Sequence, residues 1–174
     1  MIKFESERSF EDFLQNEFNS TGMCPITDEE FDSCYRQFDT KSYGICDLVY
    51  VSSYPLDSDA IEVQLNIHVI ELKTEQIKPA DIAQICRYKT YFERATKNIK
   101  NVDLTFSLVV PAGISSSQDC CYLINALEDD VFVYEFSLSP STGISFCLSN
   151  GYSKNVEKLS SVKCILPEGI EYVG

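Results

Sequence analysis

The chain has 174 residues, of which 44% are hydrophobic, and this length and composition fit one folded domain with a sizeable core. Its net charge of −13 argues against a protein that passively coats nucleic acid. No apolar run approaches the roughly 20 residues of a membrane helix, and the charged start MIKFESERSF is not typical of a signal peptide. We therefore expect a cytoplasmic protein whose eight cysteines are mostly buried, reduced thiols.

The first predicted element is a helix that Ser6 is suited to cap and that runs to about Asn19. Its apolar residues recur at helical spacing and form a buried stripe of Phe10, Phe13, Leu14 and Phe18. On a helical wheel Glu7 falls inside this stripe and Glu11 falls at its edge. Because an acid in the first turn is favoured by the helix dipole, Glu7 fits either a cap or a group aimed into the core.

Three strands are predicted next, at residues 35–38, 45–54 and 66–74. Asp47 interrupts the apolar run of the second strand. In the third strand, NIHVIELKT, alternation places Glu71 and Lys73 on one face and His68 on the other. Its apolar residues occupy both faces, which predicts a central strand covered on both sides, and the turn at 55–60 predicts a hairpin or meander. Burying an unpaired charge costs at least a few kcal/mol, so these acids favour a metal site.

A second helix is predicted from about Pro79 to Asn98, where Gln84, Arg87, Tyr88 and Tyr91 share a face. Residues 73–100 carry seven Lys/Arg and three Asp/Glu, whereas the rest of the chain carries seven and twenty-four. A solvated helix face is the simplest explanation of this basic excess. Further elements are predicted as a strand at 103–112, a helix at 118–127, paired strands at 131–138 and 144–148, and an edge strand at 162–166.

The order of these elements resembles the PD-(D/E)xK nuclease superfamily over about residues 6–112, and most closely its RecB-like and archaeal mismatch and Holliday-junction nuclease domains. The stretch YRQFDTKSYGICDL is similar to the strands that lead to the first acid of the family, and IHVIELKT to its E-x-K strand. QICRY matches the Q-x-x-x-Y motif that follows, and SERSF resembles the start of the first helix. Cys46 stands where the family often has proline.

The resemblance implies a fold as well as a site. The expected fold is an α/β protein of the α+β type, with a restriction-endonuclease-like core whose central mixed sheet is flanked by helices. Residues 1–112 would form this core, and residues 113–174 would add C-terminal strands to the same single domain.

The implied activity is hydrolysis of phosphodiester bonds, in DNA more than RNA, with Mg²⁺ or Mn²⁺. Asp47 and Glu71 supply the hard oxygen ligands that these ions prefer, and the resemblance adds the Leu72 carbonyl. Lys73 would orient or activate the attacking water and stabilise the phosphorus centre. By resemblance, Gln84 and Tyr88 would hold Lys73 or the substrate phosphate. Glu7 would be an outer metal ligand or hold a metal-bound water, with Glu11 as the alternative to Glu7. The basic residues expected to meet the nucleic acid are Arg87, Lys89, Arg94 and Lys97, beside Tyr88.

Two other functions remain open from the sequence. One is a catalytically silent nuclease fold that serves as a binding or regulatory module, for instance in a phage or defence system. The other is an acidic DNA mimic, which the negative charge outside residues 73–100 would suit. The presence of all four signature positions favours the enzyme. A homodimer is expected by resemblance, because two sites are needed to cut both strands of a duplex.

Overall fold

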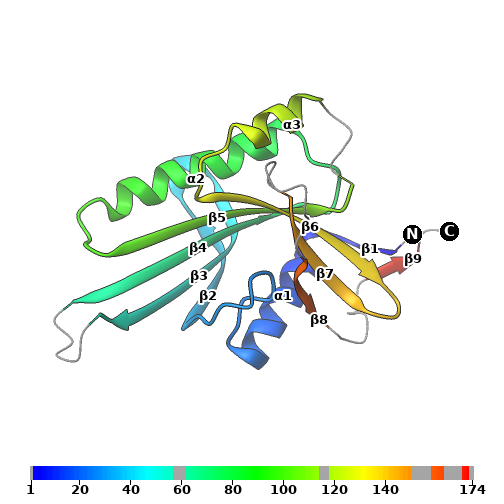
Figure 1. The fold of residues 1–174 in the computed structure, drawn as a ribbon, viewed down its shortest axis with the longest axis horizontal. Helices are drawn as coiled ribbons and strands as arrows, with labels where there is room; N and C mark the ends of the chain where they lie inside the picture. Colours follow the sequence, from blue (N-terminus) through cyan, green and yellow to red (C-terminus); the bar gives the residue numbers. More distant parts are fainter. Residues whose placement is uncertain (1, 57–61, 114–117, 150–157, 163–169, 173–174) are drawn as a thin grey trace.

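The computed structural model of the chain describes residues 2–56, 62–113, 118–149, 158–162 and 170–172. Within these residues a mixed sheet of seven strands runs in the order β2-β3-β4-β5-β6-β7-β8, and a second sheet pairs β1 with β9. Helix α1 covers one face of the large sheet, and α2 and α3 cover the other, as Figure 1 shows. The predicted α/β fold, with a central mixed sheet flanked by helices, is confirmed.

The elements have these bounds. The helices are α1 (Glu7–Thr21), α2 (Pro79–Thr96), α3 (Gln118–Asn125) and the short 3₁₀ helix η1 (Lys41–Tyr43). The strands are β1 (Ile2–Phe4), β2 (Ser33–Asp39), β3 (Ile45–Pro55), β4 (Val63–Leu72), β5 (Val102–Pro111), β6 (Val131–Ser139), β7 (Gly143–Leu148), β8 (Lys158–Val162) and β9 (Ile170–Tyr172).

Most predicted elements recur with ends that differ by a few residues. Ser6 caps α1 as predicted, because its Oγ accepts a hydrogen bond from Ser9 N at 3.1 Å. The edge strand expected at residues 162–166 occupies Lys158–Val162 instead, and residues 163–166 lie outside the described part of the chain. The sequence analysis missed β1, a strand of three residues that pairs with β9 from the other end of the chain. Such a short strand has too few residues to show a period of two.

Strand β4 is the central strand that the sequence predicts. It pairs antiparallel with β3 and parallel with β5, and α2 forms the crossover between β4 and β5. Its residues Ile70 and Leu72 are fully buried in the cluster under α1, whereas Val69 is fully buried in the cluster under α2. Apolar side chains on both faces therefore keep water from both sides of this strand.

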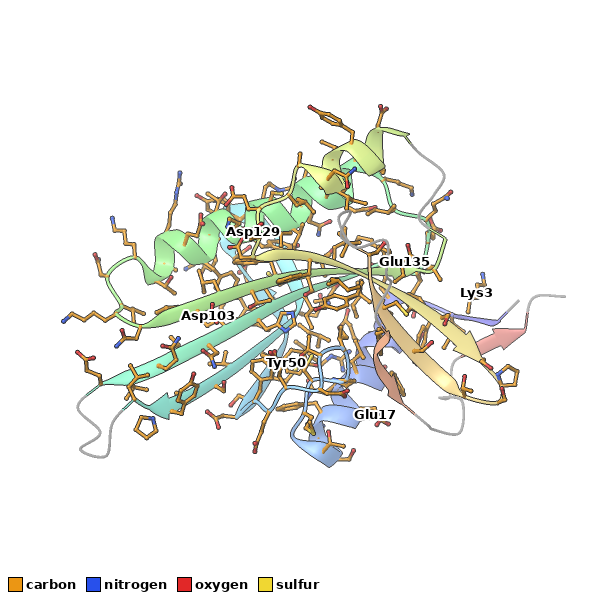
Figure 2. All side chains as sticks on the ribbon, in the orientation of Figure 1. Lys3, Glu17, Tyr50, Asp103, Asp129 and Glu135 are labelled. Carbon is orange, nitrogen blue, oxygen red and sulfur yellow. The ribbon has the colours of Figure 1, made fainter. Side chains whose placement is uncertain are left out.

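The two faces of the sheet hold separate apolar clusters. Tyr50, which Figure 2 labels, is fully buried in the cluster that α1 covers, whereas Asp129 is exposed. Phe10 of α1 stacks against Phe4 of β1 with ring centroids 4.2 Å apart, and both rings are buried. The strand that was missed thus closes the end of the α1 cluster. No helix in the described ranges combines the length and apolarity needed to cross a membrane.

Candidate active site

Asp47 lies where the pairing of β3 with β4 stops. The register pairs Leu48 with Ile70. Beyond this pair the Asp47 side chain, instead of the β3 backbone, accepts the next hydrogen bond from β4. Its Oδ2 accepts a hydrogen bond from Leu72 N at 2.7 Å, and its carboxyl group is buried, with the residue 7% exposed. The carboxylate is therefore held between the ends of the two strands, on a rigid part of the scaffold.

Glu71 and Lys73 meet at the same end of β4. Lys73 Nζ lies 2.6 Å from Glu71 Oε1 and 3.6 Å from Glu7 Oε1, so the ammonium joins the central strand to the first turn of α1. Glu71 is only 2% exposed, and its second oxygen, Oε2, is buried without any hydrogen-bond partner among the described residues. An unpaired carboxylate oxygen at such a depth is costly, which points to a cationic partner for it.

The electrostatics of the site show an excess of acid. Burial, with the nearby Asp47 charge adding to it, raises the pKa of Glu71 to about 8. Burial also raises the pKa of Asp47 to about 6, although the hydrogen bond from Leu72 N acts in the opposite direction. For Lys73, burial lowers the pKa, but the charges of Glu71, Glu7 and Asp47 outweigh burial and the net shift is upward. Lys73 is thus an ammonium ion shared by acids that it does not neutralise completely.

The two glutamates of α1 differ from the expectation. Glu11, expected at the edge of the stripe, is the buried one, at 4% exposed, whereas the side chain of Glu7 is 43% exposed. Glu11 accepts hydrogen bonds from Gln37 Nε2 at 2.7 Å and from Arg36 Nη2 at 3.1 Å. Glu7 is at the helix start, where the chain end leaves it open to solvent and within reach of Lys73.

Gln37 connects this arrangement to Asp47, and the sequence analysis missed it. Its Nε2 lies 3.3 Å from Asp47 Oδ1 and donates to Glu11 as well, so one amide bridges two buried acids. Gln37 has a φ of 47°, in the left-handed region, and this irregularity lies on an edge strand. A non-glycine residue with positive φ carries little signal in a single sequence, so only the structure reveals the bridge.

The donor set suits a hard divalent cation. Asp47 and Glu71 offer carboxylate oxygens, and Glu71 Oε2 has no other described partner. The N–H and C=O groups of one strand residue point to the same side of the strand. Because the Leu72 N–H donates to Asp47, the Leu72 carbonyl oxygen also faces the Asp47 side. No cluster of three or more His, Cys, Asp or Glu side chains suited to a metal occurs in the described residues. Two carboxylates are a donor set on the scale that Mg²⁺ uses, since this ion is commonly bound by one or two carboxylates and completes its shell with water and substrate phosphate.

Gln84 and Tyr88 do not contact Lys73, which corrects one of the roles expected for them. Gln84 Nε2 bonds the Tyr88 hydroxyl at 2.7 Å, and that hydroxyl donates to the carbonyl oxygen of Ile45 at the start of β3. Tyr88 is fully buried, so it is not on a surface that nucleic acid reaches. The pair instead anchors the start of β3, two residues before Asp47.

Gly44 makes this anchor feasible, and its replacement gives a testable result. Its φ of 116° and ψ of −163° belong to a region that essentially only glycine adopts, and an added Cβ would lie 3.2 Å from the Tyr88 ring. We expect Gly44→Ala to lower the free energy of unfolding by about 2–3 kcal/mol, measured by urea denaturation. Gly22→Ala is the control, because nothing lies within 4 Å of its Cβ, and we expect it to cost only about 1 kcal/mol. Equal losses in the two variants would contradict the role of the close approach.

The basic residues of α2 fall into different environments. Lys89 is 9% exposed and pairs with Asp130, with Glu128 at 2.9 Å and with Glu93 at 3.3 Å, so carboxylates already surround its charge. Its position therefore does not match the expected contact with nucleic acid, because this network turns the ammonium toward the loop before β6. The other three expected residues, Arg87, Arg94 and Lys97, are exposed, and Arg94 donates to the Tyr43 hydroxyl of η1 at 2.6 Å.

No protein-family model matches the chain, and no curated protein sequence matches it either. Among solved structures, the chain is similar to a repair endonuclease from Pyrococcus abyssi, with 21% sequence identity and a TM-score of 0.47. The match covers 75% of this chain and 46% of that one, so the chain spans less than half of the endonuclease. The functional conclusion therefore depends on the side-chain geometry described above.

Proposed function

We propose that the protein is a divalent-metal-dependent nuclease of the PD-(D/E)xK type that hydrolyses phosphodiester bonds, in DNA more than in RNA. Asp47, Glu71 and the Leu72 carbonyl would hold Mg²⁺ or Mn²⁺. The ion would supply a Lewis acid that offsets the negative charge of the scissile phosphate. The observation that carries the proposal is the buried, unpartnered Oε2 of Glu71, beside a second buried carboxylate that the strand ends hold in place.

The side chains of the site have distinct roles in this proposal. Lys73, whose raised pKa keeps it protonated, would stabilise the charge that develops on the phosphoryl oxygens and orient the attacking water. This favours an electrostatic role for Lys73 over that of a general base. Glu7 would hold the ammonium from the α1 side, at the 3.6 Å distance described above. Gln84 and Tyr88 would act indirectly, by anchoring the start of β3. Gln37 would act indirectly as well, by positioning Asp47.

The nucleic acid would approach along the outer face of α2. Arg87, Arg94 and Lys97 are exposed there, in a chain whose charge is otherwise strongly negative. A local basic surface beside the acidic site would orient a polyanion whose approach the rest of the molecule opposes. A homodimer with two such sites stays a prediction, as does a cytoplasmic location.

The test compares the wild-type protein with Asp47→Asn on single-stranded, duplex and branched oligonucleotides, each with and without Mn²⁺. We expect cleavage of at least one substrate by the wild type with Mn²⁺, and none by Asp47→Asn. The circular-dichroism spectrum of the variant should be unchanged, because the asparagine amide oxygen still accepts from Leu72 N. Cleavage by the variant at the wild-type rate would refute the site. Binding without cleavage by the wild type would favour the silent binding module.

The basic surface on α2 yields a separate prediction. We expect Arg87→Ala with Lys97→Ala to weaken binding to the preferred oligonucleotide and to reduce the slope of log K against log salt by about 2. Each lost phosphate contact removes roughly one released counterion. Fluorescence anisotropy over a salt series, with Asp47→Asn as the background to prevent cleavage, measures the slope. The control exchanges Arg87→Lys and Lys97→Arg, which preserve the charge and should preserve the slope. An unchanged slope in the alanine variant would exclude this surface.

A further inference from the structure

A polar pocket on the α1 face of the sheet is separate from the candidate active site. The register aligns Ser52, Asn66 and Asp103 in one row across β3, β4 and β5, and places His68 beside Thr105 in the next row. These residues line a pocket of about 180 Å³ together with Ile67 and with Glu29, Glu30 and Phe31 from the segment before β2. We call it the His68 pocket. It shares no lining residue with the active site, so its role is independent of the proposed nuclease activity.

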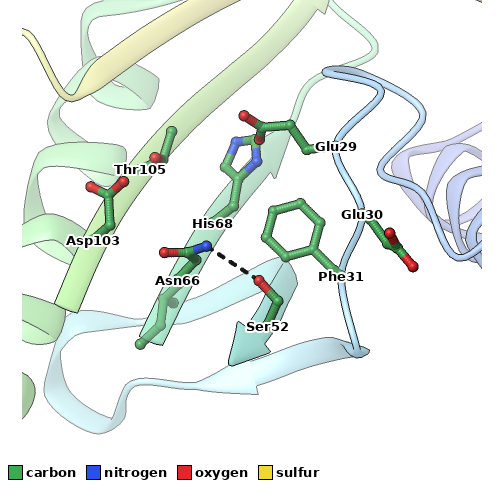
Figure 3. A pocket seen from close by; sticks show the side chains of 9 residues that line it. Glu29, Glu30, Phe31, Ser52, Asn66, His68, Asp103 and Thr105 are labelled. Atoms are coloured by element: carbon green, nitrogen blue, oxygen red, sulfur yellow. Dashed lines mark hydrogen bonds between the residues drawn. The ribbon is translucent and has the colours of Figure 1, made fainter. Parts of the chain in front are cut away.

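His68 presents an unused hydrogen-bonding atom in this pocket. Its ring lies among the lining residues drawn in Figure 3, and the residue is 1% exposed. Nε2 lies 2.7 Å from Ser107 Oγ, whereas Nδ1 is buried and has no partner among the described residues. Burial lowers the pKa of His68 to about 4, so the ring is neutral at pH 7. Of the two neutral tautomers, the one that donates from Nε2 to Ser107 leaves a free acceptor at Nδ1. In that tautomer the pocket is suited to a ligand that donates hydrogen bonds.

The charged residues of the pocket determine whether that ligand is a cation or an anion. Three carboxylates, those of Glu29, Glu30 and Asp103, are among the lining residues, and none of the described residues that line the pocket is Lys or Arg. Phe31, which is 7% exposed, adds an aromatic ring, and such rings attract cations at their faces. The volume of the His68 pocket is slightly larger than that of a cavity of about 150 Å³ that holds benzene. The ligand is therefore a small cation of about that size.

We propose that the His68 pocket binds a small aliphatic ammonium ion, which donates hydrogen bonds to His68 Nδ1 and forms ion pairs with the carboxylates at the rim. An organic ammonium fits the pocket because the lining combines carboxylates with the aromatic ring of Phe31, which a bare metal ion would not use. Its N–H groups match a nitrogen acceptor and several carboxylate oxygens at once, and its carbon chain lies against Phe31. The partner is thus a free alkylamine or diamine, and the site is distinct from the surface proposed for nucleic acid.

The test uses the fact that His68 is the only histidine of the chain. Imidazole ¹⁵N resonances in the full-length protein therefore report on this pocket alone. At pH 7, titration with the short diamine putrescine is expected to shift the Nδ1 resonance in a saturable manner. The neutral diol of the same chain length and Mg²⁺ at matched ionic strength are the comparison ligands, and both are expected to leave the resonance unchanged. A missing or non-saturable response to putrescine would overturn the proposal, and so would an equal response to either comparison ligand.

Two rim substitutions make the test specific to the pocket. Glu29 and Asp103 are exposed, so Glu29→Gln with Asp103→Asn should leave the fold intact, as the unshifted remainder of the amide spectrum would show. We expect this double variant to weaken putrescine binding by about tenfold, because it removes two charge-assisted interactions. Asp129→Asn, which removes an exposed carboxylate outside the pocket, is the matched control and should bind like the wild type. Wild-type affinity in the double variant would refute the assignment. Loss of nuclease activity in Asp47→Asn has no bearing on this result.

Discussion

Glu71→Gln is expected to stabilise the metal-free protein while abolishing its divalent-ion-dependent cleavage. In the folded protein the pKa of Glu71 is raised from 4.5 to about 8, because the group is buried and lies near Asp47. The folded state therefore binds more protons than the unfolded state between these two pH values, and stability falls as pH rises through this window. Glutamine has no titratable charge, so the variant does not lose stability as the pH rises through this window. We expect a gain of roughly 2 kcal/mol in the free energy of unfolding at pH 9, and little change at pH 4.

The same substitution should remove the response to metal. Mn²⁺ that binds only the folded wild type raises its stability with concentration, and Glu71→Gln should lose this response. Cleavage should fall on the order of a thousandfold or more, since the ion contributes several kcal/mol of charge stabilisation. Urea denaturation at both pH values, with EDTA or Mn²⁺, separates the two effects from each other. Glu75→Gln is the control, because the Glu75 side chain is 81% exposed and pairs with the exposed Lys78. A variant that is destabilised at pH 9 and still active would refute the assigned site.

Lys73→Met is expected to lose turnover while keeping its affinity for metal. In the described structure the ammonium occupies Glu71 Oε1 at 2.6 Å, so it competes with a metal ion for the same carboxylate. Removing it leaves the donors free, and we expect the Kd for Mn²⁺ to be unchanged or lower in calorimetric titration. Turnover should fall by about a hundredfold or more, because the positive charge near the phosphate is gone. A large loss of metal affinity would contradict the role given to Lys73.

The stability of this variant supplies a second readout. Removing one partner of a buried ion pair leaves an uncompensated charge where Glu71 is ionised, so the metal-free Lys73→Met protein should lose about 3 kcal/mol at pH 9, above the Glu71 pKa of about 8, and less at neutral pH. Saturating Mn²⁺ should restore most of this loss, because the ion neutralises the same carboxylates. Lys78→Met serves as the control, since the Lys78 side chain is 66% exposed and an exposed pair contributes at most about 1 kcal/mol. If Mn²⁺ restored no stability to Lys73→Met, the cation site would be elsewhere.

Local patterns in the sequence predicted most of the fold. The Ser6 cap, the apolar stripe of α1 and the two-faced apolar pattern of β4 each involve neighbours within one element. The hairpin of β3 and β4 and the β4-α2-β5 crossover follow from the order of elements and the turns between them. The short strand β1 is different, because its partner β9 lies at the other end of the chain. No local pattern signals a pairing over that distance.

The candidate site, like the fold, has features that the sequence predicts and contacts that only the structure shows. The spacing of Glu71 and Lys73 on one strand is local, so the sequence alone predicted that they share a face, and the structure adds that they form an ion pair at 2.6 Å. Which buried group uses which partner is a tertiary matter. The sequence contains no trace of the Gln37 bridge or of Tyr88 bonding to Ile45, because each joins residues from separate elements.

The sequence by itself determined most of the elements, the central strand and the acids and amine at its end, because periodicity and spacing act within a few residues. Only the tertiary structure decided how each charge is compensated. Lys89 counts as basic in the sequence, yet acids from the loop before β6 surround it. Glu71 is a candidate ligand from its place on the strand, yet only the structure shows that its Oε2 is buried without a partner among the described residues. The energy of a charge depends on its burial and its neighbours, and the fold sets both.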